Sequence, residues 1–164
     1  MQQRKLVLLA VAGVVVVVAA AVGFVYLAPK GSTTVAQELP AGAMMGSEAR
    51  GGTLRDGAAL HHSEGSVKLL EGQDGWFLRF EDYDATSGPD VYFYLTRGTS
   101  DWSAAEVEGN GVRVPVPGGA ADGQATLRGD FNVPLAGGVD PAQYRGLAVW
   151  CRNFDTLFGY AALA

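Results

Sequence analysis

Residues 66–80, with the sequence SVKLLEGQDGWFLRF, carry the clearest fold signal in the chain. Two runs rich in apolar and aromatic residues, 66–71 and 76–80, lie on either side of Gly72-Gln73-Asp74-Gly75. Glycine and aspartate favour tight turns, and two such runs joined by a short turn are typical of a β-hairpin. We therefore predict two antiparallel strands that meet at residues 72–75.

The same kind of pattern continues to the end of the chain. Further strands are expected at 91–95, 112–114, 126–128, 147–151 and 156–161. The run 91–95 is rich in aromatic and β-branched residues, which suits a buried strand, and the apolar run 147–151 is expected to be a central strand. After residue 30, glycine and proline occur too often for an amphipathic helix. This pattern predicts an all-β domain, an antiparallel β-sandwich with a jelly-roll-like or barrel-like arrangement.

A long hydrophobic segment precedes this domain. Residues 6–28 carry no charge, and as an α-helix they would span about 35 Å, enough to cross a hydrocarbon core of about 30 Å. Arg4 and Lys5 come before the segment, which favours the N-terminus inside the cytoplasm and the remainder outside. We predict a single-pass N-terminal transmembrane anchor over residues 1–28, with an extracytoplasmic C-terminal domain at the cell membrane.

A cleaved signal peptide is the alternative to this anchor. Ala19-Ala20-Ala21 offers an A-x-A cleavage site after an apolar stretch of suitable length. The anchor is preferred because the apolar run continues past that site. Both alternatives export the domain.

Proline and glycine interrupt every pattern between the hydrophobic segment and the domain. Residues 29–47 are therefore expected to form a flexible linker, followed by one domain over 48–164. The chain has a net charge of −5, and three of its cations, Arg4, Lys5 and Lys30, flank the hydrophobic segment. An acidic domain repels phosphate backbones, so no nucleic-acid partner is expected.

Cys151 is the only cysteine of the chain. This count excludes an intramolecular disulfide and zinc sites built from several thiolates. In a strand, Cys151 would share its face with Val149, whereas Arg152 would share the opposite face with Trp150, so Arg152 is not expected to activate the thiol. A buried structural cysteine and a reactive thiol both stay open.

His61 and His62 form the second chemical feature. Only one of two neighbouring side chains in a strand can face a given site. One histidine with Cys151 would give two ligands for a metal or haem, but the C-x-x-C-H motif of haem attachment is absent from the sequence. A polar strand edge or turn is the alternative, and we predict no metal site. The sequence also lacks the G-x-S-x-G motif of hydrolases, so a classical enzyme is not expected.

Several motifs occur together in a fixed order. They are Gly52-Thr53-Leu54, His61 with Gly65-Ser66-Val67, Leu78-Arg79-Phe80, Gly88-Pro89-Asp90-Val91-Tyr92-Phe93-Tyr94-Leu95, the stretch 129–135, Tyr144, Val149-Trp150-Cys151, Phe154 and Phe158-Gly159-Tyr160-Ala161. In this combination the chain, over about residues 48–164, resembles the electron-transfer DM-thirteen domain. This domain is a small extracellular module that in animal proteins often accompanies DOMON domains. The stretch 103–125, with extra glycine and alanine, departs from the family pattern.

The resemblance implies a β-sandwich whose hallmark cysteine is Cys151. It also implies a redox role through a naked thiol or through a bound group such as haem, so the cofactor stays unknown, with haem or no cofactor both open. His61 matches a recurrent histidine and is the expected partner of Cys151, with Trp150 shielding the site. A redox protein partner follows from this hypothesis. The alternative is a non-catalytic surface module that binds a partner through the loop at residues 88–90.

Overall fold

Ten short strands and three short helical turns make up the described part of the protein. The computed structural model describes residues 33–43, 50–114 and 127–164. One set of strands is β1 (Thr33–Ala36), β2 (Arg50–Thr53), β4 (Ser63–Gly72), β5 (Gly75–Ala85) and β8 (Leu127–Pro134). The other set is β3 (Arg55–Asp56), β6 (Val91–Thr96), β7 (Val112–Val114), β9 (Gly146–Cys151) and β10 (Thr156–Ala162). The turns are the π-helical η1 (Ala105–Asn110) and the 3-10 turns η3 (Pro141–Gln143) and η4 (Arg152–Phe154).

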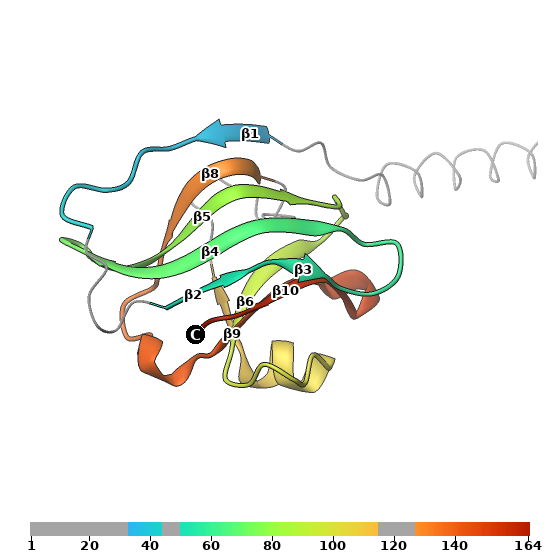
Figure 1. The fold of residues 1–164 in the computed structure, drawn as a ribbon. Helices are drawn as coiled ribbons and strands as arrows, with labels where there is room; N and C mark the ends of the chain where they lie inside the picture. The colour runs from blue at the N-terminus through green and yellow to red at the C-terminus, as the bar shows by residue number, and fades with distance from the viewer. Residues whose placement is uncertain (1–32, 44–49, 115–126) are drawn as a thin grey trace, which may run out of the picture.

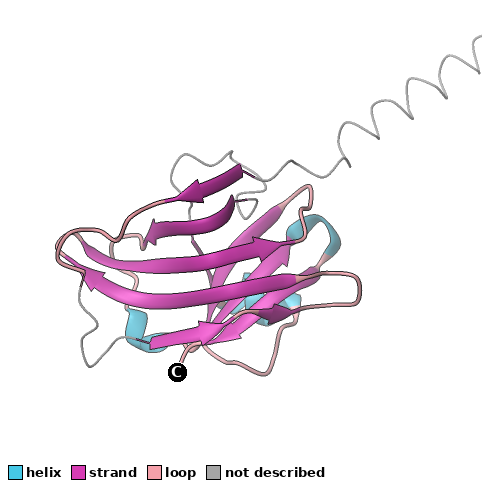
Figure 2. Ribbon diagram, turned by 45° about the horizontal axis from the view of Figure 1, so that its top comes forward, coloured by secondary structure: helices cyan, strands magenta, loops and turns pink. Residues whose placement is uncertain are grey.

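These strands form two five-stranded sheets that pack as a sandwich (Figures 1 and 2). The first sheet has the order β1-β8-β5-β4-β2 and the second β3-β10-β9-β6-β7. The prediction of a β-sandwich is confirmed. Neighbouring strands are antiparallel except for β1, which pairs parallel to β8. The predicted hairpin is also confirmed, because Gly72 pairs with Gly75 and leaves a two-residue turn between β4 and β5.

The hairpin strands are longer than predicted. β5 continues past Phe80 to Ala85, through a segment rich in acidic residues that disfavour strands. The extension is held by cross-strand ion pairs, in which Glu81 contacts Lys68 and Asp84 contacts Arg128. Partners distant in sequence therefore stabilise a strand that local propensity does not predict.

Four aromatic rings fill the space between the sheets. Phe80 and Phe131 from the first sheet stack with centroids 4.7 Å apart, and Phe80 stacks on Phe93 of the second sheet at 4.5 Å. Tyr83 meets these rings edge-on. All four are buried, and burial of each such side chain stabilises the fold by about 2–3 kcal/mol. β9 lies between β6 and β10, as the prediction of a central strand at 147–151 requires.

β1 falls inside the range 29–47 that the sequence predicts as a linker. The segment that follows it is fastened to the first sheet by Arg79, whose Nη1 donates to the Gln37 carbonyl at 2.6 Å. The Nη2 of the same guanidinium donates to Asp130 Oδ2 at 3.1 Å. Asn132 adds a hydrogen bond from its Nδ2 to the Glu38 carbonyl at 2.7 Å. We call residues 33–43 the N-terminal strap.

A glycine on β8 makes room for this strap. Gly129 has φ +85°, in the left-handed region, and a Cβ at this position would lie 2.3 Å from the Val35 carbonyl oxygen. Only glycine allows the two backbones to approach so closely.

The predicted transmembrane segment 6–28 and its signal-peptide alternative lie outside the described residues. Within the ranges that the structure describes, no helix has the length and apolar character needed to span a bilayer. Of the stretch 103–125, the structure describes residues 103–114, which include η1 and β7.

Candidate functional site

Cys151 ends β9 with its side chain directed into the sandwich. The residue is 0 % exposed and belongs to the same buried cluster as Val149 and Phe158. Trp150 lies on the other face of β9, where it packs with Tyr92 and donates from Nε1 to Glu108 Oε1 at 2.7 Å. The alternation expected for this strand is therefore present. The expectation that Trp150 shields the thiol is wrong, because consecutive side chains of β9 point to opposite faces.

Three backbone amides influence the ionisation of the Cys151 thiol. The N–H groups of Asp90, Phe154 and Asn153 favour its charged form. The Cys151 side chain makes no capping hydrogen bond to η4, which begins directly after it. Burial raises the pKa of the thiol above its ordinary value and is the largest effect. The three amides lower this pKa, and the Asp90 carboxylate raises it. The net direction is upward, so Cys151 is a protonated thiol at neutral pH.

Arg152 does not face the thiol. Its guanidinium lies over the Tyr92 ring, 5.5 Å from the centroid, and its Nε lies 3.7 Å from Glu108 Oε2. The cation is therefore on the Trp150 side of the sheet, as the alternation along the strand predicts.

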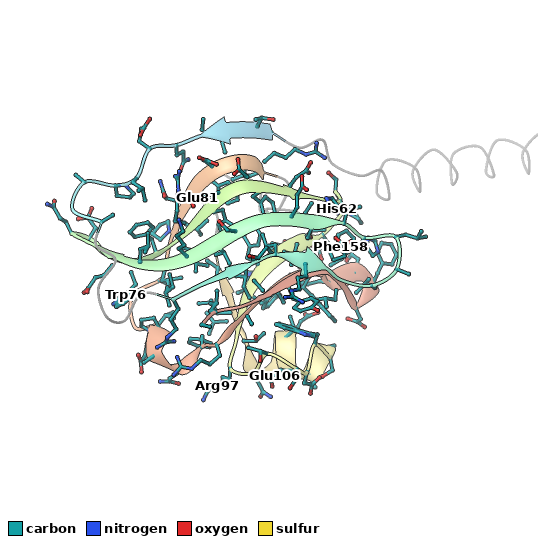
Figure 3. The ribbon with its side chains drawn as sticks, viewed as in Figure 1. His62, Trp76, Glu81, Arg97, Glu106 and Phe158 are labelled. Carbon is teal, nitrogen blue, oxygen red and sulfur yellow. The ribbon has the colours of Figure 1, made fainter. Side chains whose placement is uncertain are left out.

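The two histidines point apart. The His61 ring stacks on Phe158, with centroids 3.8 Å apart and planes at 17°. Its Nδ1 is buried and has no hydrogen-bond partner among the described residues, and desolvation lowers the pKa of the imidazole. His62 contacts two carboxylates instead, with its Nδ1 3.0 Å from Asp56 and its Nε2 3.5 Å from Glu64. Figure 3 shows His62 and Phe158 at the same end of the sandwich.

A pocket of about 390 Å³ opens beside His61. It is lined by His61, Ser87, Gly88, Pro89, Phe154, Thr156 and Phe158. Cys151 does not line this pocket. Phe158 lines the pocket, where its ring stacks on His61, and it also belongs to the buried cluster that contains Cys151. Gly88 packs closely against this ring, because a Cβ at position 88 would lie 2.9 Å from Phe158 Cε2. The structure therefore places His61 in the pocket and Cys151 in the buried core, outside the pocket lining.

The loops around this pocket are tied together by backbone hydrogen bonds. The Ala58 amide donates to the Leu157 carbonyl at 2.8 Å, the Thr86 amide to the His62 carbonyl at 2.9 Å, and the Arg152 amide to the Asp90 carbonyl at 3.0 Å. We call this part of the molecule, formed by residues 57–62, 86–90 and 152–156, the histidine end.

A haem held by both predicted ligands does not fit this arrangement. An axial ligand must face the group that it holds, and a buried sulfur outside the pocket does not. His61 alone faces the pocket, and its ring lies flat against Phe158. Among the described residues, no three His, Cys, Asp or Glu side chains are grouped to hold a metal ion.

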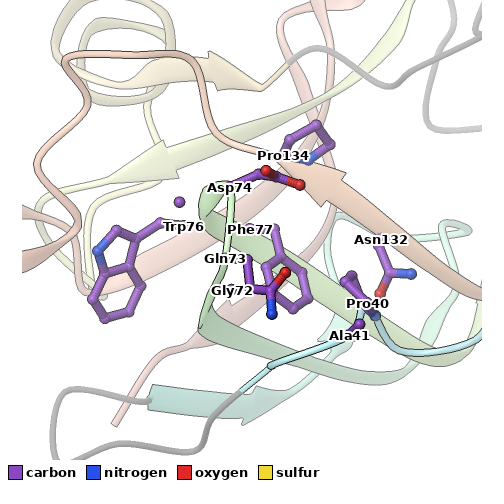
Figure 4. A pocket seen from close by; sticks show the side chains of 10 residues that line it. Pro40, Ala41, Gly72, Gln73, Asp74, Trp76, Phe77, Asn132 and Pro134 are labelled. Atoms are coloured by element: carbon purple, nitrogen blue, oxygen red, sulfur yellow. The ribbon is translucent and has the colours of Figure 1, made fainter.

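A second pocket, of about 270 Å³, lies at the opposite end of the β4–β5 hairpin (Figure 4). It is formed by the hairpin turn, Phe77, Trp76, the strap residues Pro40 and Ala41, and the end of β8. The sequence predicts the turn but not this pocket, because residues 33–43, which close it, show no pattern typical of a strand.

The fold and the site define a small two-sheet β-sandwich domain with its one thiol buried in the core and a pocket lined by His61. Residues 54–163 match the family Electron transfer DM13, the DM-thirteen family that the sequence motifs resemble. This match covers more than half of the chain, and the protein belongs to that electron-transfer family. No curated protein and no solved structure matches the chain. The strap lies outside the matched residues.

Proposed function

We propose that this domain transfers electrons through the Cys151 sulfur, with His61 at the entrance to the site. The observation that carries the proposal is the electrostatic effect of three backbone amides, those of Asp90, Phe154 and Asn153, which favours the thiolate of Cys151. Nearby backbone amides stabilise a thiolate, which is the form of cysteine that reacts with an oxidant. Membership of an electron-transfer family supports the same role.

The chemistry that suits a buried thiol is oxidation by a small peroxide. The Cys151 proton leaves, and the thiolate attacks one peroxide oxygen, so that an S–O bond forms as the O–O bond breaks. The released hydroxide takes up the proton and becomes water, and the sulfur, now a sulfenic acid, has given two electrons to the peroxide. An external thiol then displaces water to form a mixed disulfide, and a second thiol releases reduced Cys151.

We also propose that residues 6–28 anchor the protein in the cell membrane, with the sandwich outside the cytoplasm. The support is the uncharged length of this segment and the cations before it. A cleaved signal peptide would export the same domain without an anchor. The partners that follow are the membrane and an external redox protein that supplies the reducing thiol.

Oxidation of the native protein tests the redox role. Purified full-length protein is treated with hydrogen peroxide and then with a sulfenic-acid-specific probe, and the mass of the Cys151 peptide is measured. The proposal predicts one probe per chain under conditions in which the protein stays folded. The control is Cys151→Ser, which takes up no probe. Modification that begins only where circular dichroism shows unfolding would contradict the proposal.

A non-catalytic binding module is the second candidate. The complete burial of Cys151 and the raised pKa of its thiol favour it, since a resting thiol of this kind reacts slowly. Under this alternative the pocket beside His61 would take a ligand while the cysteine only packs. A folded Cys151→Ala protein that keeps its cellular role would support the binding module and contradict the redox role.

A further inference from the structure

We propose that the histidine end of the sandwich rests on the bilayer surface, with Leu60 and Phe154 as its contacts to lipid. This inference depends on the proposed membrane anchor and adds to it an orientation and a partner surface. Three observations carry it: where the exposed apolar side chains lie, where the chain enters the sandwich, and which charges surround that entrance.

Two large apolar side chains at the histidine end are exposed. Leu60 is 98 % exposed and Phe154 is 56 % exposed. Leu60 precedes His61 and has φ +72°, a left-handed conformation that costs a non-glycine residue about 1–2 kcal/mol. Phe154 lines the pocket beside His61. Among the described residues, the one other large exposed hydrophobic side chain is Leu39, which precedes the strap residues that line the distant pocket.

The strap brings the chain into the sandwich at this same end. Thr33 of β1 pairs with Leu127 at the start of β8, and Gly129 of β8 pairs with Tyr83 near the end of β5. β5 ends at Ala85, which pairs with Ser63 directly after the two histidines. Figure 1 shows β1 beginning at the end of the molecule where the β3–β4 connection lies.

The distance from the hydrophobic segment to the strap is short. Four residues separate Ala28 from Thr33. Even when fully extended, this connection reaches only about 17 Å. An anchored chain therefore keeps the start of β1, and with it the histidine end, within about 17 Å of the bilayer. The opposite end of the hairpin lies roughly 30 Å away along the strands and is free of this restriction.

The charges at the histidine end do not favour binding to anionic lipid. The carboxylates of Asp56 and Glu64 meet His62, and Asp155 follows the η4 turn. Arg152 is turned toward Glu108. Arg128, which pairs with Thr34 at the start of β1, contacts Asp84. Because these described cations are matched by carboxylates, contact with lipid depends on the apolar side chains, and it applies to zwitterionic bilayers.

Fluorescence quenching by labelled lipid tests the orientation. Full-length protein is reconstituted into phosphatidylcholine nanodiscs that contain a lipid with a nitroxide near its headgroup. Leu60→Trp is compared with Leu39→Trp, and the unsubstituted protein gives the background of the native tryptophans. We expect the added fluorescence to be quenched at least twofold at position 60 and not at position 39. Phe154→Asp in the Leu60→Trp protein should reduce this quenching.

The outcomes separate docking from anchoring. Protein that floats with vesicles and resists an alkaline wash, yet shows no quenching at position 60, would retain the anchor and overturn the docking. Equal quenching at positions 39 and 60 would overturn a fixed orientation. If quenching at position 60 is lost when more chains are placed in each disc, this surface binds a second copy. That result would overturn the contact with lipid. Protein removed by the alkaline wash would overturn the anchor and the docking together.

Discussion

Opposing electrostatic effects meet at Cys151. Burial favours the neutral thiol, whereas the amides of Asp90, Asn153 and Phe154 favour the thiolate. The result is a thiol that rests protonated because burial outweighs the effect of the amides. A resting thiol of this kind is protected from slow adventitious oxidation, and it becomes nucleophilic only when its proton has a place to go.

The raised pKa of Cys151 predicts a specific loss of stability in alkali. The folded-state pKa lies above the unfolded value of about 8.5, so the contribution of the protonated thiol is complete below that value. It is lost as the pH rises toward the folded-state pKa, because only the unfolded chain ionises there. Urea unfolding at pH 7 and pH 10 should show a larger loss for the native protein than for Cys151→Ser. Burial also raises the pKa of Tyr83, but this residue is present in both proteins, so its effect on the difference in stability cancels. Equal losses would contradict this prediction.

His61 is predicted to titrate below the ordinary histidine value of about 6.5. Desolvation against Phe158 disfavours its charged form. The stability contribution of the neutral ring is therefore complete above the unfolded value of about 6.5, and it is lost as the pH falls from there through the lower folded-state pKa. An NMR titration of the imidazole Cε1–H resonances measures this pKa directly, with His61→Gln to assign the signal. A midpoint at or above 6.5 would mean that the ring is more hydrated than the structure shows.

The position of the 86–90 loop depends on the small size of Gly88. A methyl group at this position would lie 2.6 Å from Val91 Cγ2 and 2.9 Å from Phe158 Cε2. We predict that Gly88→Ala displaces the 86–90 loop from the Phe158 ring and increases the rate at which a thiol reagent reaches Cys151 by about tenfold in the folded protein. The control is Gly98→Ala, where the nearest atom would be a Glu106 oxygen at 3.9 Å. Equal rates for both variants would show that reagents reach the sulfur by another route.

Among the elements, the strap is the one whose pairing depends most on a single residue. Gly129→Ala places a Cβ against the Val35 carbonyl at a positive φ, so we predict release of β1 and a loss of about 1–3 kcal/mol of stability. Amide exchange of residues 33–38 should accelerate, while the β4–β5 hairpin stays protected. Gly137→Ala is the matched control, because nothing lies within 4 Å of its added methyl. Retained protection of the strap in Gly129→Ala would contradict the prediction.

Element by element, the sequence predicted best where the signal was local. The turn at residues 72–75 and the apolar runs of β6 and β9 contain their own evidence for a strand, and these elements were predicted within a few residues. β1, β2 and β3 were missed because they are short and polar, and each is held by a neighbour distant in the chain. The strap depends on the Arg79 guanidinium, which no period or propensity in residues 33–38 encodes.

For the whole molecule, the two candidate site residues came from different kinds of reasoning. Strand alternation placed Cys151 on the face of Val149, opposite Arg152, and the motif resemblance pointed to His61. Neither gave the pocket, since it is assembled by loops from three separate parts of the chain. The family match supports the electron-transfer class, and the role of each residue stays a prediction for the experiments above.

The parallel pairing of β1 with β8 also has a mechanical consequence. A pull that reaches the sandwich through Thr33 acts along the axis of β1, so it loads the ladder from Thr33 to Ala36 in shear. Hydrogen bonds loaded in shear resist together, whereas those at a peeled edge break one after another. Arg79 and Asn132 add side-chain bonds just beyond the last ladder pair. The strap would therefore behave as a force-bearing clamp, and its rupture would lengthen the tether before the sandwich itself gave way.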